Sequence, residues 1–334
     1  MTSIGIFESE EIERRYLERL LSNHKLSFYH EPLSTENINK VKDCEVIIVF
    51  IYSKIDKKLL DKLPKVKLIV TMSTGYEHID IKECKRRKIA VCNVPAYGEM
   101  TVAEHTFALL LAISRKIVES VERTRKGDFS IEGLTGFDLN NKTIGIIGTG
   151  KIGSHVAKIA NSFEMKIIAH SEHKNEALEE LPNFKYVEID EILKNSDIIT
   201  LHAPLTNDTI HMINKKNIKK IKKGAILINT ARGGLVETEA LLFALKNGII
   251  KYAGLDVLEE ECFVKEEKEL LSPSFKKTCD LRTVLANHML IKQENVIITP
   301  HNAFNSEEAL LKIVSTTVET INAFINGKNI NVVN

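Results

Sequence analysis

Three glycines within six residues are the feature of this chain whose spacing most directly indicates chemistry. Residues 148–153 read Gly-Thr-Gly-Lys-Ile-Gly, directly after the apolar run 144–147 and directly before a stretch with apolar residues at helical spacing. In such a strand-to-helix turn the glycines allow a tight bend, close approach of a pyrophosphate and close packing of helix on strand. The free N–H groups of the helix N-terminus then face the phosphates. The candidate cofactor contacts in this turn are Gly148, Gly150, Lys151, Ile152 and Gly153.

Three ionisable residues further along could carry out the chemistry that a dinucleotide supports. Arg232 follows the apolar run 225–229, His301 follows the run 296–299, and Glu261 lies between them. Arginine can hold a carboxylate through two parallel hydrogen bonds, and histidine can transfer a proton near neutral pH. A neighbouring glutamate stabilises the protonated imidazole. Such a set suits the reversible reduction of a keto acid by hydride from a dinucleotide.

Residue types alone leave ordinary roles open for these side chains. Arg232 could be a surface residue in a glycine-rich turn, Glu261 a solvated member of an acidic run, and His301 a capping or core residue. His105, inside an expected helix, is interpreted as structural. His78 and His202 are expected to lie in loops that act through their backbone.

Apolar segments of strand length alternate with amphipathic segments along most of the chain, which predicts α/β architecture with parallel sheets. The first hundred residues predict a small doubly wound unit without a glycine fingerprint. Its expected strands are 3–7, 26–29, 45–50, 67–71 and 90–93, with helices at 10–21 and 79–87. A second unit begins at Lys142. Its expected strands are 143–147, 166–169, 197–201, 225–229, 252–255 and 296–299.

The last expected helix, 306–325, follows the second unit in the sequence. The first unit, however, has no other element that could complete it. We therefore expect a discontinuous first domain, formed by residues 1–100 and 301–334, with a flavodoxin-like doubly wound sheet that binds substrate. A Rossmann NAD(P)-binding domain, residues 101–300, is expected to be inserted into it. A helix from 101 to about 116 starts this domain. Segment 127–141 is expected to be a loop, and 262–293 a surface excursion with short helices.

Composition limits the possible partners. The net charge of +1 and the pI near 7.7 do not suggest a nucleic-acid stripe or a membrane-binding face. We expect no signal peptide, because the N-terminus has no basic region followed by a long apolar run. The five cysteines lack C-x-x-C or Cys/His ligand spacing, which predicts reduced thiols in a cytoplasmic protein without a structural metal site.

Five segments, in order along nearly the whole chain, resemble motifs of the D-isomer-specific 2-hydroxyacid dehydrogenase family: 148–153, 201–206, 229–234, 254–261 and 299–304. The resemblance implies that Arg232 binds the substrate carboxylate and keto oxygen. It implies that His301 donates the proton as hydride arrives from nicotinamide, while Glu261 keeps His301 protonated and oriented. The cofactor contacts that it implies are Ala203, Pro204, Thr209, Thr230, Ala231 and Asp256.

The first domain also carries the resemblance. Segment 73–80 is similar to the family loop whose backbone N–H groups cradle the substrate carboxylate, which assigns Ser73, Thr74 and Gly75 to substrate binding. The D-lactate dehydrogenase branch looks nearest, with its substrate-wall aromatics matched by Tyr52, Tyr97 and Phe304. An apolar wall would favour short uncharged side chains such as the pyruvate methyl group. Ordinary core packing is the alternative for these aromatics.

One position departs from the expected pattern. The acidic residue that grips the adenosine ribose should end the second strand, and Ser171 lies there. Ser171 with His173 and Lys174 could accept a 2′-phosphate, which would allow NADP, whereas Glu172 could bind ribose and repel phosphate. The family habit favours NAD.

Other functions remain compatible with this pattern. The same chemistry could act on hydroxypyruvate, glyoxylate or a bulkier 2-keto acid. A phosphorylated acid would require extra cations in the substrate wall, where only Lys54 lies near Tyr52. A non-catalytic NAD(H)-sensing regulator, similar to the co-repressors of this family, is the alternative of another class. The resemblance also implies a homodimer formed through the nucleotide domain.

Overall fold

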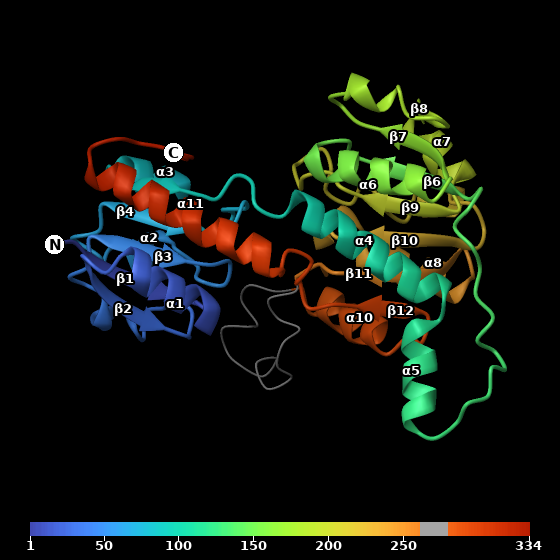
Figure 1. The fold of residues 1–334 in the computed structure, drawn as a ribbon, viewed down its shortest axis with the longest axis horizontal. Helices are drawn as coiled ribbons and strands as arrows, with labels where there is room; N and C mark the ends of the chain where they lie inside the picture. The colour runs from blue at the N-terminus through green and yellow to red at the C-terminus, as the bar shows by residue number, and fades with distance from the viewer. Residues whose placement is uncertain (261–279) are drawn as a thin grey trace. The chain divides into compact units, whose positions relative to one another are not determined.

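The computed structural model describes residues 1–260 and 280–334, which divide into two compact units (Figure 1). Unit 1 comprises Met1–Gly98 and Asn305–Asn334, and unit 2 comprises Glu99–Phe304. Each unit contains a parallel sheet with helices on both of its faces, so the predicted α/β fold class is confirmed.

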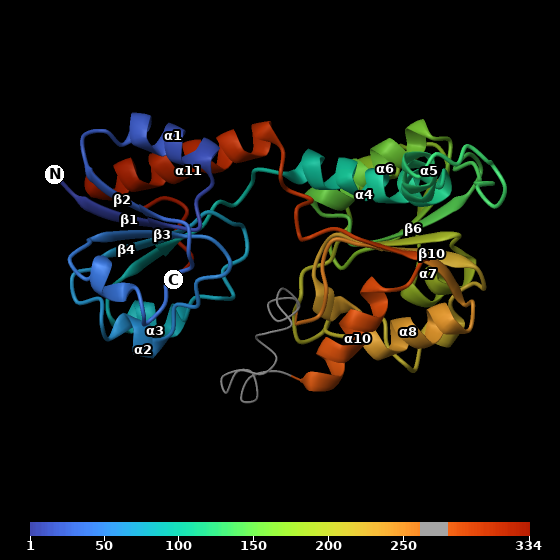
Figure 2. The same cartoon turned by 90° about the horizontal axis from the view of Figure 1, so that it is seen from below.

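Unit 1 has a five-stranded sheet in the order β2-β1-β3-β4-β5. Its strands are β1 (Ser3–Phe7), β2 (Lys25–Tyr29), β3 (Val46–Val49), β4 (Leu68–Thr71) and β5 (Ala90–Cys92). Every residue of β3 and β4 is buried, as expected for parallel strands covered on both faces. One face is covered by α1 (Glu11–Leu20) and α11 (Glu307–Ile325), and the other by α2 (Lys57–Leu60) and α3 (Ile81–Arg86) (Figure 2).

Helix α11 brings the end of the chain back to unit 1. It packs beside α1 and buries an apolar stripe against the sheet (Figures 1 and 2). The Ser306 hydroxyl accepts a hydrogen bond from the N–H of Ala309 and caps the helix N-terminus. Unit 1 therefore takes its core from both ends of the sequence.

Unit 2 has a seven-stranded parallel sheet in the order β12-β11-β10-β9-β6-β7-β8. Its strands are β6 (Thr143–Ile147), β7 (Lys166–His170), β8 (Phe184–Tyr186), β9 (Ile198–Leu201), β10 (Ala225–Asn229), β11 (Ile250–Leu255) and β12 (Val296–Ile298). Helices α4 (Glu99–Ser114), α5 (Ile117–Arg125) and α6 (Lys151–Ser162) lie on one side, and α7 (Ile189–Asn195), α8 (Thr238–Lys246) and α10 (Leu281–Ile291) on the other (Figure 2). Two apolar clusters fill the layers between sheet and helices.

Several elements differ from the sequence expectation. Strand β8 was not predicted, because Phe184–Tyr186 is a short edge strand with no fully buried residue. Helix α5 was also missed, and it too has no buried residue. Part of the expected excursion at 262–293 is the helix α10, while residues 262–279 lie outside the described residues. Within the described chain, no helix is long and apolar enough to cross a bilayer.

Both sheets contain a position where the direction of winding reverses. In unit 1 it lies between β1 and β3, and in unit 2 between β6 and β9. The connections that leave two such strands run over opposite faces, which opens a crevice beyond their carboxyl ends. Open α/β sheets bind ligands in this crevice, so these two edges are where a functional site is expected.

Candidate functional site

The glycine-rich turn joins β6 to α6 at the reversal point of unit 2. Gly148 has a left-handed backbone with φ of +96°, and a Cβ atom there would lie 2.6 Å from the carbonyl oxygen of His202. A Cβ atom on Gly153 would lie 1.9 Å from the carbonyl oxygen of Gly148, whereas one on Gly150 would meet no protein atom within 4 Å. Gly148 and Gly153 are therefore required by the protein itself, and the space beside Gly150 is open to a ligand.

The start of α6 offers donors to an anion. Gly150 is the N-cap residue of this twelve-residue helix and provides no side-chain cap, so the first N–H groups keep their hydrogen-bonding capacity. The ammonium of Lys151 lies 3.1 Å from the carboxylate of Glu99. A cavity of about 540 Å³ lies beside this turn and is lined by Thr149, Gly150 and Lys151, among others. Ile152 is partly buried and packs against an apolar cluster of unit 2.

The remaining cofactor candidates on this side lie in loops that follow β7 and β9. The Ser171 hydroxyl donates to the carbonyl of His173 at 2.9 Å, directly after β7. The loop 203–209 begins at Ala203. The Thr209 hydroxyl donates to the carbonyl of Pro204 at 2.6 Å and so stabilises this loop. These contacts hold the loop backbone in place.

The side chain of His202 is buried below the loop that follows β9. Its Nε2 atom lies 2.9 Å from the Thr200 hydroxyl, and burial lowers the pKa of His202 to about 3. The imidazole is therefore neutral at physiological pH and contributes no charge next to the glycine-rich turn.

Arg232 lies in a turn directly after β10. The turn is held by the side chain of Asn229, which the sequence analysis did not identify as a candidate. The buried Asn229 side chain accepts from the N–H of Ala231 at 3.1 Å and donates to the carbonyl of Arg232 at 2.9 Å. The hydroxyl of Thr230 lies 2.9 Å from that of Thr106 on α4. The guanidinium of Arg232 donates to the carbonyl of Ala231 at 2.8 Å, and among the described residues its other N–H groups have no acceptor.

Asp256 organises the segment that carries His301. Its buried carboxylate accepts hydrogen bonds from the N–H groups of Asn302 and Ala303 at 3.0 and 2.9 Å, and from the Thr299 hydroxyl at 2.5 Å. Its backbone carbonyl accepts from the N–H of His301 at 2.9 Å. These bonds hold His301 in a left-handed conformation with φ of +54°, which is costly for a non-glycine residue and is typical of functional sites.

His105 on α4 reaches the same cluster. Its Nε2 atom lies 3.0 Å from the hydroxyl of Thr299 and 3.6 Å from the Asp256 carboxylate. It therefore braces the carboxylate that positions the His301 segment, in keeping with a structural role.

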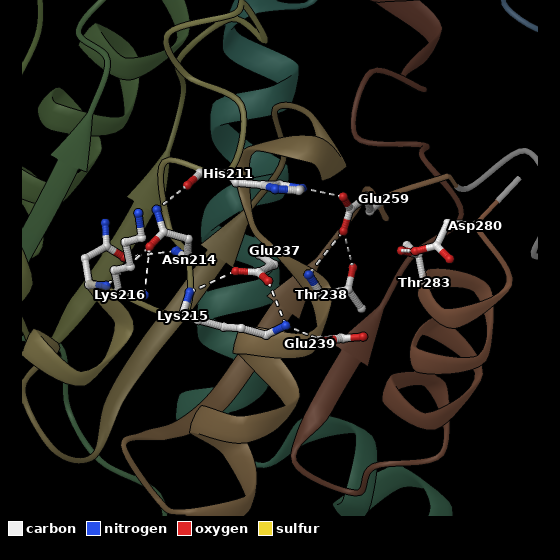
Figure 3. Close-up of polar contacts among 11 residues, drawn as sticks. His211, Asn214, Lys215, Lys216, Glu237, Thr238, Glu239, Glu259, Asp280 and Thr283 are labelled. Carbon is white, nitrogen blue, oxygen red and sulfur yellow. Dashed lines mark hydrogen bonds and ion pairs between the residues drawn. The ribbon is translucent and has the colours of Figure 1, made fainter.

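Glu261 lies outside the described residues. Just before it in the chain, Glu259, which the sequence analysis did not single out, forms several hydrogen bonds. Figure 3 shows the Glu259 carboxylate between His211 and Thr238. One oxygen lies 2.5 Å from Nε2 of His211, and the other accepts from the N–H and the hydroxyl of Thr238, at 3.1 and 2.8 Å. A salt bridge from Lys215 to Glu237, 3.0 Å long, supports the neighbouring turn (Figure 3). The acidic run that contains Glu259 could have indicated this contact, but the run holds several glutamates and does not show which of them makes it.

In unit 1, the candidate carboxylate cradle follows β4 and is held by its side chains. The Ser73 hydroxyl donates to the carbonyl of Gly75 at 2.6 Å, and the Thr74 hydroxyl donates to the carbonyl of Val94 at 2.9 Å. Among the described residues, the backbone N–H groups of Thr74 and Gly75 donate to no protein acceptor. Two such N–H groups on a braced turn form a nest suited to an anion.

His78, from the same loop, is neutral. Burial lowers the pKa of His78 to about 4, and its Nε2 atom lies 3.3 Å from the Thr71 hydroxyl. Of the three aromatic candidates, Tyr52 and Tyr97 belong to unit 1 and Phe304 ends unit 2, and all three are half-buried.

The chain is similar to known proteins over most of its length. Residues 107–303 match the model for the NAD-binding domain of D-isomer-specific 2-hydroxyacid dehydrogenases. The chain belongs to this family. The structure of D-lactate dehydrogenase from Aquifex aeolicus, complexed with NAD and lactic acid, is 37% identical with a TM-score of 0.84, covering 97% of this chain and 96% of that one.

Curated relatives cover the same length. A 2-hydroxyacid dehydrogenase homolog from Haemophilus influenzae is 36% identical over 332 residues, which is 97% of each chain. Glyoxylate reductase from Thermococcus litoralis is 35% identical over 333 residues, covering 97% of this chain and 94% of the relative. This family member is an NAD-dependent oxidoreductase that acts on D-2-hydroxy acids or their keto forms.

The residues of this dehydrogenase fit NAD on structural grounds. The open space beside Gly150 and the uncapped start of α6 would take the pyrophosphate, with Lys151 as the nearby cation. Arg232, Asp256 and His301 lie beyond β10, β11 and β12, three neighbouring strands whose carboxyl ends share one edge with that of β6. The structure thus gathers these candidates at the edge where the NAD turn lies.

Gly153→Ala should disturb both the fold and NAD binding, because the added Cβ would overlap the Gly148 carbonyl. Overpacking of this kind costs about 1–3 kcal/mol, which corresponds to a fall in Tm of several degrees. We expect the affinity for NADH, measured by fluorescence titration, to fall about tenfold or more. Gly150→Ala is the matched control, because its Cβ meets no protein atom: it should keep the wild-type Tm and lose affinity. A wild-type Tm for Gly153→Ala would contradict the packing argument.

Asp256→Asn should loosen the segment 299–303. The amide has one acceptor oxygen and turns a donor toward N–H groups that need acceptors, which costs about 1–3 kcal/mol of folding free energy. We expect kcat/KM to fall about a hundredfold as His301 loses its fixed position. Asp56→Asn is the control, because this aspartate caps α2 by accepting from the N–H of Leu59 and asparagine caps equally well. Thermal unfolding and steady-state kinetics measure both effects, and equal behaviour of the two variants would be evidence against this role of Asp256.

Proposed function

We propose that this enzyme reduces a short 2-keto acid, with pyruvate to D-lactate as its main reaction. The observation that carries the proposal is the position of Arg232, Asp256 and His301 beyond three neighbouring strands, at the same sheet edge as the glycine-rich turn. The 37% identity to D-lactate dehydrogenase from Aquifex aeolicus, whose structure contains lactic acid, supports the choice of substrate.

The reaction divides among few groups in this proposal. NAD, when bound, supplies or accepts the hydride at the substrate carbon. Arg232 binds the substrate carboxylate and polarises the keto oxygen. His301 donates a proton to that oxygen, and Glu261 keeps the imidazole protonated and oriented. Asp256 fixes the backbone that presents His301.

Each unit has one task in this proposal. Unit 2 is the NAD-binding domain, and unit 1, made from both ends of the chain, is the substrate domain. The paired N–H groups of Thr74 and Gly75 hold a carboxylate, while Tyr52 and Tyr97 of the same unit provide an apolar wall. Such a wall has room for a short uncharged side chain.

Reduction of glyoxylate is the second candidate. It is favoured by the 35% identity to glyoxylate reductase from Thermococcus litoralis over nearly the full length of both proteins. Glyoxylate has a hydrogen where pyruvate has a methyl group, so the same carboxylate and keto contacts would serve both. Hydroxypyruvate and bulkier 2-keto acids differ from these substrates only in the side chain that would contact the aromatic wall.

We propose NAD in preference to NADP. The Ser171 hydroxyl already donates to the carbonyl of His173, and the Lys174 ammonium lies 5.3 Å from the ring centre of Tyr186. Two of the three groups that could bind a 2′-phosphate thus have partners within the protein, while the carboxylate of the exposed Glu172 would repel it.

The cysteines favour the cytoplasm as the location of this enzyme. Cys44, Cys84 and Cys92 are buried free thiols. Burial raises the pKa of Cys84 and of Cys92 to about 11, which keeps both protonated and unreactive. Reduced buried thiols of this kind suit a reducing compartment.

Mixed with pyruvate, the wild-type enzyme should oxidise NADH rapidly and NADPH slowly, and chiral analysis should find D-lactate. Replacing the proton donor in His301→Ala should lower kcat by about 10²–10⁴-fold. Loss of absorbance at 340 nm measures both effects. The control is His30→Ala, because His30 is exposed in unit 1. Turnover by His301→Ala at the wild-type rate would contradict the proposed mechanism, and a preference for NADPH would contradict the cofactor assignment.

We also propose that this enzyme forms a homodimer through α5 and the loop that follows it. Helix α5 has no buried residue, and Phe129 and Ile131 in the loop are 80% and 84% exposed. The Arg123 guanidinium donates to the carbonyls of Ser130 and Glu132 at 2.8 and 2.7 Å, so the loop is tied to the helix. An ordered apolar surface of this kind is typical of a subunit interface.

Introducing two polar residues, Phe129→Ser and Ile131→Ser, should convert the dimer into a monomer. Each change removes an apolar side chain that would be buried against the second copy. Sedimentation velocity measures the result, with wild type expected at twice the 37.7 kDa chain mass. Ile12→Ser, which changes an exposed apolar residue of unit 1, should leave the dimer intact. A monomeric wild type, or a double variant of unchanged mass, would rule out this interface.

A further inference from the structure

Glu8 is a charged residue at the carboxyl edge of unit 1 to which the proposed mechanism gives no task. It directly follows β1 and reaches the loop that follows β3, across the point where the winding reverses. One carboxylate oxygen accepts from the N–H of Tyr52 at 2.7 Å. The other accepts from the N–H of Phe50 at 3.2 Å and from the hydroxyl of Ser53. One side chain therefore fixes the loop 50–53.

The backbone of Glu8 is strained, and its neighbours hold it in that conformation. Glu8 has a left-handed backbone with φ of +60°, which is costly for a residue with a side chain. The Ser53 hydroxyl also accepts from the N–H of Leu33 at 2.8 Å, so the network joins three loops at the same edge. Strained polar residues held by several neighbours are typical of functional sites.

The hydrogen-bond pattern suits an ionised carboxylate. The two backbone N–H groups can only donate, and the Ser53 hydroxyl receives a bond from Leu33 and has its own hydrogen for Glu8. Burial, the largest cause, raises the pKa of Glu8 above its usual value, and these donors oppose that shift. Among the described residues, no lysine, arginine or histidine forms an ion pair with this carboxylate. In its ionised form, Glu8 therefore places at this edge a negative charge that has no ion-pair partner in the described part of the chain.

The same loop carries an aromatic pair. The rings of Phe50 and Tyr52 pack edge to face with their centres 6.1 Å apart. Because Glu8 binds the backbone N–H of both residues, it sets the position of this pair. The carboxylate thus contacts the backbone of the loop segment that carries Tyr52.

We propose that Glu8 determines substrate specificity by fixing the Phe50–Tyr52 wall and by placing a negative charge behind it, which disfavours 2-keto acids with a second carboxylate. This inference rests on the proposed function, in which Tyr52 faces the substrate side chain. A neutral side chain loses nothing to the charge, whereas an anionic one is repelled through a medium of low effective dielectric.

A second glutamate shows what a merely structural role involves. Glu13 on α1 is buried, and its carboxylate accepts from the N–H of Glu10 at 2.9 Å, three residues away, in a capping box. Its contacts stay within one helical turn, whereas those of Glu8 join residues 42 to 45 positions apart. Glu13→Gln is therefore a matched control for Glu8→Gln.

The test compares two substrates of similar shape, 2-oxobutyrate and oxaloacetate, which differ by a terminal methyl group in place of a carboxylate. Wild type should prefer 2-oxobutyrate. In Glu8→Gln the ratio of kcat/KM for oxaloacetate to that for 2-oxobutyrate should rise about tenfold or more, with the change in KM rather than kcat. Glu8→Asp keeps the charge and should keep the wild-type ratio, even with a less well-held loop. Glu13→Gln should also keep that ratio.

The outcomes separate this inference from the proposed function. If Glu8→Gln lowers kcat/KM equally for both acids, Glu8 acts only on the fold and the specificity role is wrong. If Glu8→Gln is too unstable to assay, Glu8→Asp provides the test. A changed ratio of the two kcat/KM values in Glu8→Asp, which keeps the charge, would contradict the role proposed for that charge. If wild type reduces neither acid, nor pyruvate, with NADH, the proposed function itself fails. Thermal unfolding of each variant gives the accompanying change in Tm.

Discussion

A parallel sheet requires every strand to end at the same edge, and the rest of this molecule follows from that constraint. The two sheets of this chain are wholly parallel, and β3 and β4 are buried along their whole length. Each strand must be followed by a crossover, so the loops that leave the carboxyl ends collect side by side. In unit 2 this arrangement brings the glycine-rich turn after β6 to the same edge as Arg232 and His301.

Loops at such an edge leave the hydrogen-bond ladder abruptly, and their backbone N–H groups need new acceptors. A carboxylate can accept several hydrogen bonds at once, and this chain uses that capacity repeatedly. Asp256 accepts from two N–H groups of the His301 segment, and Glu259 accepts from the first N–H group of α8. Each of these acids joins two loops that are distant in sequence, which is how the site acquires fixed positions without belonging to a single element.

The sequence was sufficient where a signal is local. Apolar runs rich in isoleucine and valine predicted the buried strands, and the glycine spacing at 148–153 predicted a turn whose Cβ contacts leave room only beside Gly150. The edge strand β8 is only three residues long and helix α5 has no buried residue, and neither element was predicted. Site residues Arg232 and His301 were singled out by their place after strands, which parallel topology brings to one edge.

The partners of acidic residues could not be predicted in the same way. Glu259 belongs to a run of three acids, and nothing in that run tells which carboxylate meets His211 and Thr238. Glu8 precedes further acids near the N-terminus and resembles a solvated residue until the fold brings the loop after β3 to it. Sequence spacing describes one element at a time, whereas these contacts depend on how two connections cross the sheet.

The use of carboxylates as acceptors for loop backbone has a consequence for chemistry. A hydrogen bond from an N–H group orients a dipole but removes no charge, so each acid that braces a loop leaves a negative charge near the site. Asp256 has the imidazole of His105 at 3.6 Å, whereas no lysine, arginine or histidine of the described residues forms an ion pair with Glu8. The carboxylate that braces unit 2 therefore lies beside a histidine, and the one that braces unit 1 has only hydrogen-bond donors as partners. In our proposal this difference is the reason why Glu8 bears on substrate specificity, because a carboxylate without an ion-pair partner repels a second anionic group more strongly than a paired one does.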